Sequence, residues 1–185
     1  ERLSSNDAAL ALVPLPFYLR HREALRLAPR AQAVMAGGQA SEPWSLVAAT
    51  GKVKSPAALD GFELVSLAGY VPRFVRGPAL GAWGELPPGV TITFSGAVLS
   101  GLRRAAAGEK VALLLDGPQA AAMTSLPFAA TLEVVVRSAP LPVSVLCLVG
   151  TRLPAARSGS LLKALPHLGG SEAGAAALAG LRLAA

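Results

Sequence analysis

Cysteine, histidine, aromatic residues and charged residues are all scarce in this chain of 185 residues. A single cysteine excludes an intrachain disulfide, and the two histidines stand in no metal-binding spacing, so no metal site is predicted. Aromatic residues make up 5% of the chain, too few for a module that stacks nucleic-acid bases on aromatic rings. We therefore expect no metal ion, no other cofactor and no nucleic-acid partner.

Long unbroken apolar runs are also missing, although hydrophobic residues make up 52% of the chain and charged residues only 15%. No stretch reaches about eighteen apolar residues without a charge or a proline, so the sequence predicts a packed core and no membrane insertion. The first five residues lack the basic and apolar segments of a signal peptide, and there is no initiator methionine. We expect a processed or trimmed chain, in which the missing signal leaves the compartment open.

The formal net charge of +6 is dispersed along the chain rather than gathered in one stripe. The densest basic pieces are residues 20–22 and 103–104, which are too short to follow a phosphate backbone. The charge therefore predicts no nucleic-acid interface.

Two valine-rich runs, residues 132–136 and 143–149, are the clearest structural signal. Both are too short to span a membrane and too rich in valine for a good helix, so they predict buried strands. The second run contains Cys147, which we interpret as a small buried apolar residue rather than a nucleophile. Residues 137–142 lie between the runs and hold two prolines, which cannot donate to a strand ladder, so we expect a stiff connector that lines a cleft.

The rest of the chain alternates short apolar runs with helical patterns. We expect further strands at residues 8–13, 44–50, 62–67, 90–94 and 111–115, and helices at 17–30, 97–107, 119–125, 158–168 and 171–183. Strands that alternate with helices of about ten residues across short turns predict an α/β fold with a mostly parallel sheet.

No catalytic motif appears in the sequence. The nucleophile elbow, the phosphate-binding loop and the dinucleotide-binding glycine motif are all missing. Asp60, Glu109 and Asp116 stand singly, and although folding could bring two carboxylates together, the sequence nominates no pair. We therefore expect a protein that is not an enzyme.

Small polar residues do follow several of the expected strands, at residues 66–70, 95–97 and 116–118. In open α/β sheets, turns at the carboxyl ends of strands form the ligand crevice, and helix N-termini there hold anions. Ser95 precedes the helix expected at 97–107, so we interpret it as the N-cap of that helix, with ligand donation as the second hypothesis.

Several short motifs occur in the order known from one family. They are Asp7-Ala8-Ala9 with Pro16-Phe17-Tyr18, Trp44-Ser45-Leu46-Val47, Ser55 with Leu59 and Gly61, Gly69-Tyr70-Val71-Pro72, Gly108-Glu109, and Ser138-Ala139-Pro140. Together they resemble the type II periplasmic substrate-binding proteins, above all the phosphate/phosphonate-binding proteins of ABC transporters. Two positions depart from the family: Leu67-Ala68 replaces a hydroxyl-rich turn, and Val111 replaces an aspartate.

The resemblance implies a two-lobed α/β fold in which each lobe is a mostly parallel sheet flanked by helices. Lobe one would comprise residues 1–43 and 152–185, and lobe two residues 44–151. Family members begin with a further strand–helix–strand portion, so we expect lobe one to be incomplete in this chain.

The resemblance further implies an extracytoplasmic or periplasmic solute-binding protein that binds a small, phosphate- or phosphonate-like ligand between two lobes. An ABC permease would be its partner, and hinge motion would close it on the ligand. The ligand contacts expected from hydroxyl groups and aromatic rings are Tyr18, Ser45, Tyr70, Ser95 and Ser138. Two alternatives stay open: the effector-binding domain of a LysR-like transcriptional regulator, and an α/β enzyme in which His21 or His167 meets an acid.

Overall fold

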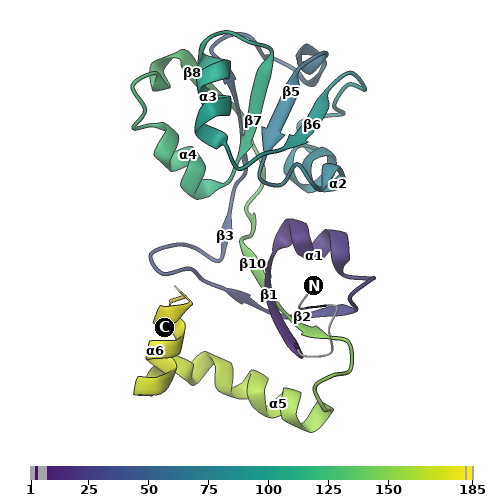
Figure 1. Cartoon of the computed structure of the whole chain (residues 1–185), viewed down its shortest axis with the longest axis vertical. Helices are drawn as coiled ribbons and strands as arrows, with labels where there is room; N and C mark the ends of the chain where they lie inside the picture. Colours follow the sequence, from purple (N-terminus) through teal and green to yellow (C-terminus); the bar gives the residue numbers. More distant parts are fainter. Residues whose placement is uncertain (1–2, 4–7, 182, 185) are drawn as a thin grey trace. The chain divides into compact units, whose positions relative to one another are not determined.

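The computed structural model describes residues 3, 8–181 and 183–184, and it divides the chain into two compact units. Unit 1 comprises Glu1–Ser41 and Pro142–Ala185, and unit 2 comprises Glu42–Leu141. The chain passes between the units twice (Figure 1). The two short strands at these crossings, β3 (Ser41–Glu42) and β9 (Leu141–Pro142), pair with each other.

Unit 2 is built on a five-stranded sheet in the order β6-β5-β7-β4-β8. Its strands are β4 (Ser45–Ala49), β5 (Glu63–Ser66), β6 (Thr91–Phe94), β7 (Val111–Leu115) and β8 (Leu132–Arg137). β5 runs parallel to β6 and β7, whereas β4 is antiparallel to both β7 and β8. The carboxyl ends of β5, β6, β7 and β8 therefore meet the amino end of β4 at one edge of the sheet.

Helical segments connect these strands. They are η1 (Pro56–Leu59), α2 (Pro72–Phe74) with the π-helical turn η2 (Val75–Ala79), α3 (Val98–Ala106), α4 (Gly117–Met123) and η3 (Ala129–Thr131). All five residues of β7 are buried, as expected for a central strand that is covered on both faces. The amphipathic face of α3 packs Leu102 and Ala105 against Val65, Val111 and Leu113 in the core of unit 2.

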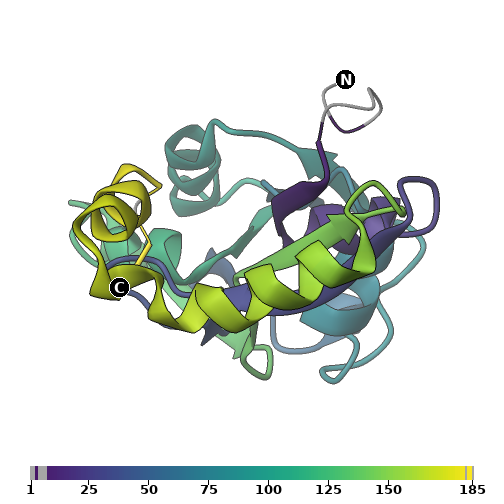
Figure 2. The ribbon, with the colours of Figure 1, turned by 90° about the horizontal axis from the view of Figure 1, so that it is seen from below.

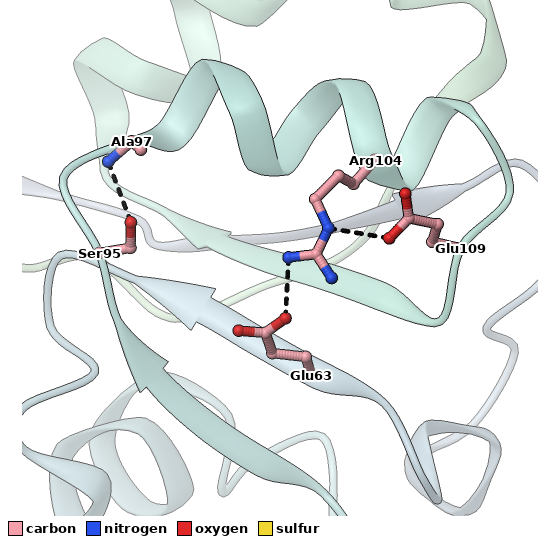
Figure 3. A network of polar contacts seen from close by, with 5 residues as sticks. All are labelled: Glu63, Ser95, Ala97, Arg104 and Glu109. Atoms are coloured by element: carbon pink, nitrogen blue, oxygen red, sulfur yellow. Dashed lines mark hydrogen bonds and ion pairs between the residues drawn. The ribbon is translucent and has the colours of Figure 1, made fainter.

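One surface ion network ties the far end of α3 to the sheet. Nε of Arg104 donates to Glu109 at 2.8 Å, and its Nη1 donates to Glu63 at 2.9 Å (Figure 3). These three side chains lie toward the end of α3 opposite Ser95, so the network is separate from the turn that precedes the helix.

Unit 1 contains a three-stranded antiparallel sheet in the order β1-β10-β2. Its elements are β1 (Leu10–Pro14), α1 (Leu15–His21), β2 (Leu27–Ala33), β10 (Ser144–Val149), α5 (Ala155–Ala164), η4 (Leu165–Gly170) and α6 (Glu172–Gly180). One face of the sheet forms the core of the unit with Val13, Leu27, Val145 and Val149, against which Phe17 of α1 packs. The segments α5, η4 and α6 follow one another as an outer layer of this unit (Figure 2).

Most of the strands expected from the sequence are present, and the mixed α/β fold is confirmed. The expectation of a mostly parallel sheet in each lobe is wrong for unit 1, where β10 pairs antiparallel with both β1 and β2. Cys147 is fully buried, and burial raises the pKa of its thiol, so its interpretation as an apolar residue is confirmed. The helix expected at 17–30 is wrong beyond His21: a turn with Arg26 at φ 49° follows, and β2 begins at Leu27. Pro29 is incompatible with the last part of the expected helix, because proline disrupts a helix interior but is tolerated in β2 at the edge of its sheet.

The two valine-rich runs belong to different units. β8 lies in unit 2 and β10 in unit 1, whereas we expected both on the lobe that extends to residue 151. The proline-containing connector between them holds β9, so the chain leaves unit 2 within this connector. Among the described residues, no helix is both long and apolar enough to cross a bilayer.

Candidate functional site

Polar side chains gather where the strand ends of unit 2 meet. Ser66 ends β5, Ser95 follows β6, Asp116 follows β7, Ser138 follows β8, and Ser45 begins β4. We call this row of turns the polar edge of unit 2. In open α/β sheets, ligands bind at the carboxyl ends of the strands, so this edge is the candidate site.

The hydroxyl of Ser66 holds the turn after β5 in place. It is buried, donates to the carbonyl oxygen of Leu114 at 2.7 Å and accepts from the amide of Ala68 at 3.1 Å. The carbonyl oxygen of Ser66 also accepts from the amides of Gly69 and Ser95, at 3.1 and 3.2 Å. Ser66 thus links the turns that follow β5 and β6, a structural role that the sequence did not reveal.

The glycine of the same turn lets two backbones approach closely. A Cβ atom on Gly69 would overlap the carbonyl group of Thr93 in β6, so only glycine fits at this position. Next to it, the ring of Tyr70 meets the ring of Phe94 edge to face, with 5.7 Å between centroids and an interplanar angle of 87°. The turn therefore packs against β6, and the Tyr70–Phe94 ring contact joins the two.

Ser95 lies two residues before the helix N-cap position that we expected it to occupy. The N-cap of α3 is Ala97, which offers no side-chain acceptor, and the Ser95 hydroxyl accepts from the Ala97 amide at 3.0 Å (Figure 3). The N-cap interpretation is therefore wrong in its position, because the hydroxyl closes a turn before the helix begins. As a rotatable donor, the Ser95 hydroxyl can still hydrogen-bond a ligand.

Ser138 and Ser45 anchor the other end of the polar edge. The Ser138 hydroxyl accepts from the Trp44 amide at 2.9 Å and donates to the carbonyl oxygen of Ala139 at 2.6 Å. Ser45 is 1% exposed and sits between Leu115 and Arg137 in the sheet. Both serines thus lie within the hydrogen-bonded backbone of the polar edge. Their contact with a ligand stays a prediction.

Two carboxylates occupy the beginning of α4. Asp116 accepts from the Gln119 amide at 2.9 Å, and Gln119 accepts from the Asp116 amide at 3.3 Å, which forms a capping box. The carboxylate of Glu42 accepts a hydrogen bond from the Gly117 amide and packs so closely that a Cβ atom on Gly117 would overlap it.

Burial raises the pKa of both carboxyl groups. The Gly117 hydrogen bond lowers the pKa of Glu42 and the charge of Asp116 raises it further, while the Gln119 amide lowers the pKa of Asp116. Sequence reasoning missed this pair, because only the Asp-x-x-Gln capping pattern marks it and Glu42 is distant in sequence.

The remaining candidates lie elsewhere. Tyr18 is half-buried on α1 and packs beside the core of unit 1. The His21 ring packs against the Phe17 ring at a tilt of 40°, with 4.4 Å between centroids, and His167 is exposed in η4. Within the described ranges, no three His, Cys, Asp or Glu side chains converge on a point where they could hold a metal ion.

Comparison with known proteins identifies the fold. No family model matches the chain and no curated relative is detected. Among solved structures, the Xanthomonas citri protein XAC2383 superimposes with a TM-score of 0.68 in both its chloride-bound and its ATP-bound form. The identities are 15% and 17%, over 93% of this chain and 67% and 68% of that one.

The binding protein of an ABC phosphonate transporter from Pseudomonas aeruginosa superimposes with a TM-score of 0.61 at 16% identity, over 96% of this chain and 62% of that one. The chain therefore has the same two-unit α/β fold as these solved structures, one of which is a binding protein. It spans about two thirds of the length of these neighbours.

Proposed function

We propose that this chain is a solute-binding protein that takes up a small ligand at the polar edge of unit 2. The observation that carries the proposal is the convergence of four strand ends, with the Ser95 hydroxyl, the first turn of α3 and the Tyr70 ring, at one edge of the sheet. This is the position at which open α/β sheets bind ligands. The resemblance of the fold to binding proteins, rather than enzymes, supports a role without catalysis.

Anions are the first ligand class to test. The neighbours' names mention chloride, ATP and a phosphonate transporter, and the first-turn amides of α3 at the polar edge suit a negative charge. Against a multiply charged anion stand Leu67 and Ala68, which offer no hydroxyl groups, and the carboxylates of Glu42 and Asp116. We therefore favour a singly charged phosphonate or a similar small anion.

The wider setting of the protein is part of the same proposal. The fold of extracytoplasmic binding proteins supports a periplasmic location and an ABC permease as partner. We also propose that unit 1 is a partial lobe. The neighbours' greater length supports this, as does the face of the unit 1 sheet on which Leu10 and Leu12 lie exposed.

Thermal unfolding with and without ligand tests the proposal. Chloride, phosphate, methylphosphonate and ATP are each added to the chain. Binding to the folded state raises Tm, and at a ligand concentration a hundredfold above Kd it adds about 2.7 kcal/mol to the free energy of unfolding. Replacing Ser95 with Ala should weaken the binding of the responding anion about tenfold, because it removes one hydrogen bond to a charged group.

Ser160 provides the matched control. Its hydroxyl donates to the Ala156 carbonyl oxygen on the exposed surface of α5, so Ser160→Ala should leave the Tm shift unchanged. If a folded chain shows no shift with any of these anions, the proposed anion-binding function is wrong. If Ser95→Ala and Ser160→Ala behave alike, binding is not at the polar edge.

A further inference from the structure

Unit 2 leaves large apolar side chains exposed next to its polar edge. Among the described residues of the unit, the large hydrophobic side chains that stay well exposed are Phe94, at 58%, and Leu99, at 43%. Phe94 is the last residue of β6 and Leu99 lies in the first turn of α3, so the two flank Ser95. An exposed phenylalanine lacks the stabilisation that its burial would bring, and here this exposed apolar surface is concentrated beside the candidate site.

The exposed ring stands on a rigid base. The turns that follow β5 and β6 share the Ser66 carbonyl oxygen as acceptor, and Gly69 lies in close contact with the Thr93 backbone of β6. The edge-to-face contact with Tyr70 then orients the Phe94 ring. A ring that is already held in place loses little side-chain entropy when a ligand stacks on it.

The groups around Phe94 indicate which kind of ligand would bind there. Aromatic rings stack favourably on other flat groups at centroid distances of about 4.5–7 Å, in offset or edge-to-face arrangements. The neighbouring Ser95 hydroxyl and the amides of the first turn of α3 offer hydrogen bonds within a few residues of the ring. A ligand that combines a flat apolar group with a polar head matches both surfaces.

We infer that the ligand of the polar edge carries a ring or a similar flat apolar group, which stacks on Phe94 while its polar head lies at Ser95 and the start of α3. The inference rests on the proposed function and names the ligand class within it. Phe94 is then a specificity residue, which selects among compounds with the same head group.

Matched pairs of compounds isolate the flat group. Calorimetric titration of the full chain compares phenylphosphonate with methylphosphonate, phenylacetate with acetate, and benzylamine with methylamine. In the pair whose head group binds, the phenyl member should bind at least about tenfold more tightly, because it adds ring stacking and apolar burial. In Phe94→Ala this preference should fall to about twofold or less, while Phe94→Tyr should retain it.

Leu181 provides the control, since it is an equally exposed apolar side chain in unit 1. Leu181→Ala should keep the full preference for the phenyl compound. Circular dichroism of each variant verifies that it is folded, which Phe94→Ala should be because its side chain is exposed.

The outcomes separate the two proposals. If the methyl compounds bind and the phenyl compounds bind no better, the inference fails while the proposed function stands. If no compound binds, and none of the anions above raises Tm, the proposed function fails and the inference fails with it. If the native chain dimerises in sedimentation and Phe94→Ala is monomeric, the ring covers a second copy of the chain, and the inference is overturned.

Discussion

Unit 2 covers both faces of its central strands, whereas unit 1 leaves one face of its sheet partly open. The residues of β7 are all buried, but in β1 buried and exposed residues alternate, with Leu10 and Leu12 on the exposed face. Beside that face lies an apolar cavity of about 370 Å³, bordered by Leu12, Val34, Leu165 and Leu178.

The outer helices of unit 1 close this face incompletely. No residue of α5 is fully buried, and in α6 only Gly174 is. Because apolar burial is the main source of stability, we expect unit 2 to be the more stable body and unit 1 the more easily opened one. The candidate site on unit 2 therefore rests on the better-packed half of the chain.

The largest expected effect comes from the core of unit 2. Leu113→Ala should lower the free energy of unfolding of this unit by about 2–5 kcal/mol, because Leu113 is fully buried and its loss leaves a cavity. Urea unfolding followed by tryptophan fluorescence measures this, since Trp44 and Trp83 both lie in unit 2. Leu12→Ala on the open face of unit 1 should leave the same transition unchanged, and equal losses would contradict the contrast between the units.

A pair of glycines sharpens the comparison at smaller scale. Gly117→Ala should cost about 0.5–1.5 kcal/mol, because the new Cβ atom displaces the flexible end of the Glu42 side chain and its hydrogen bond to the Gly117 amide is lost. Gly159 in α5 has open space around it, so Gly159→Ala should stabilise unit 1 by about 0.5–1 kcal/mol through helix propensity. Thermal unfolding of both variants measures the effects.

The double variant Glu42→Ala/Gly117→Ala isolates the cause. It should lose less stability than the sum of its single changes, since the alanine then has room. Strict additivity would show that the cost of Gly117→Ala has another origin.

The smallest effect is the pH dependence of Glu42. Burial raises its pKa above the usual 4.5, so the ionised group favours the unfolded chain, and this cost is present above the raised pKa and absent below 4.5. Glu42→Gln removes the ionisation and the repulsion with Asp116. Its stability relative to the native chain, measured by urea unfolding, should therefore rise between pH 4 and pH 7, and a relative stability that falls over this range would contradict the assignment.

Local patterns predicted much of the fold of both units. The valine-rich runs became β8 and β10, and the five consecutive apolar residues of β7 became a fully buried strand. Both predictions depend on side-chain shape and continuous apolar character, which act within a few residues. The assignment of β8 and β10 to different units could not be predicted in this way, because a valine-rich strand fits either sheet and long-range pairing decides.

The candidate site was predicted only in part, for a similar reason. Tyr70 and Ser95 were nominated from their turns, and the structure places both on the polar edge. Glu42 was not nominated, and Ser66 was named only as part of the turn at residues 66–70, because their roles depend on partners far away in sequence: Gly117 for Glu42 and Leu114 for Ser66. Phe94 was missed because its exposure cannot be read from an alternating strand pattern.

The sequence by itself determined that this chain forms short strands and helices around an apolar core, and that no residue pattern calls for a metal or a catalytic group. These properties follow from composition and from periodicities of a few residues. Only the tertiary structure decided which strand ends meet, which hydroxyl groups are already hydrogen-bonded, and that an aromatic ring stands exposed beside them. Such relations arise from contacts between distant segments, and the energy of these contacts exists only once the sheet has formed.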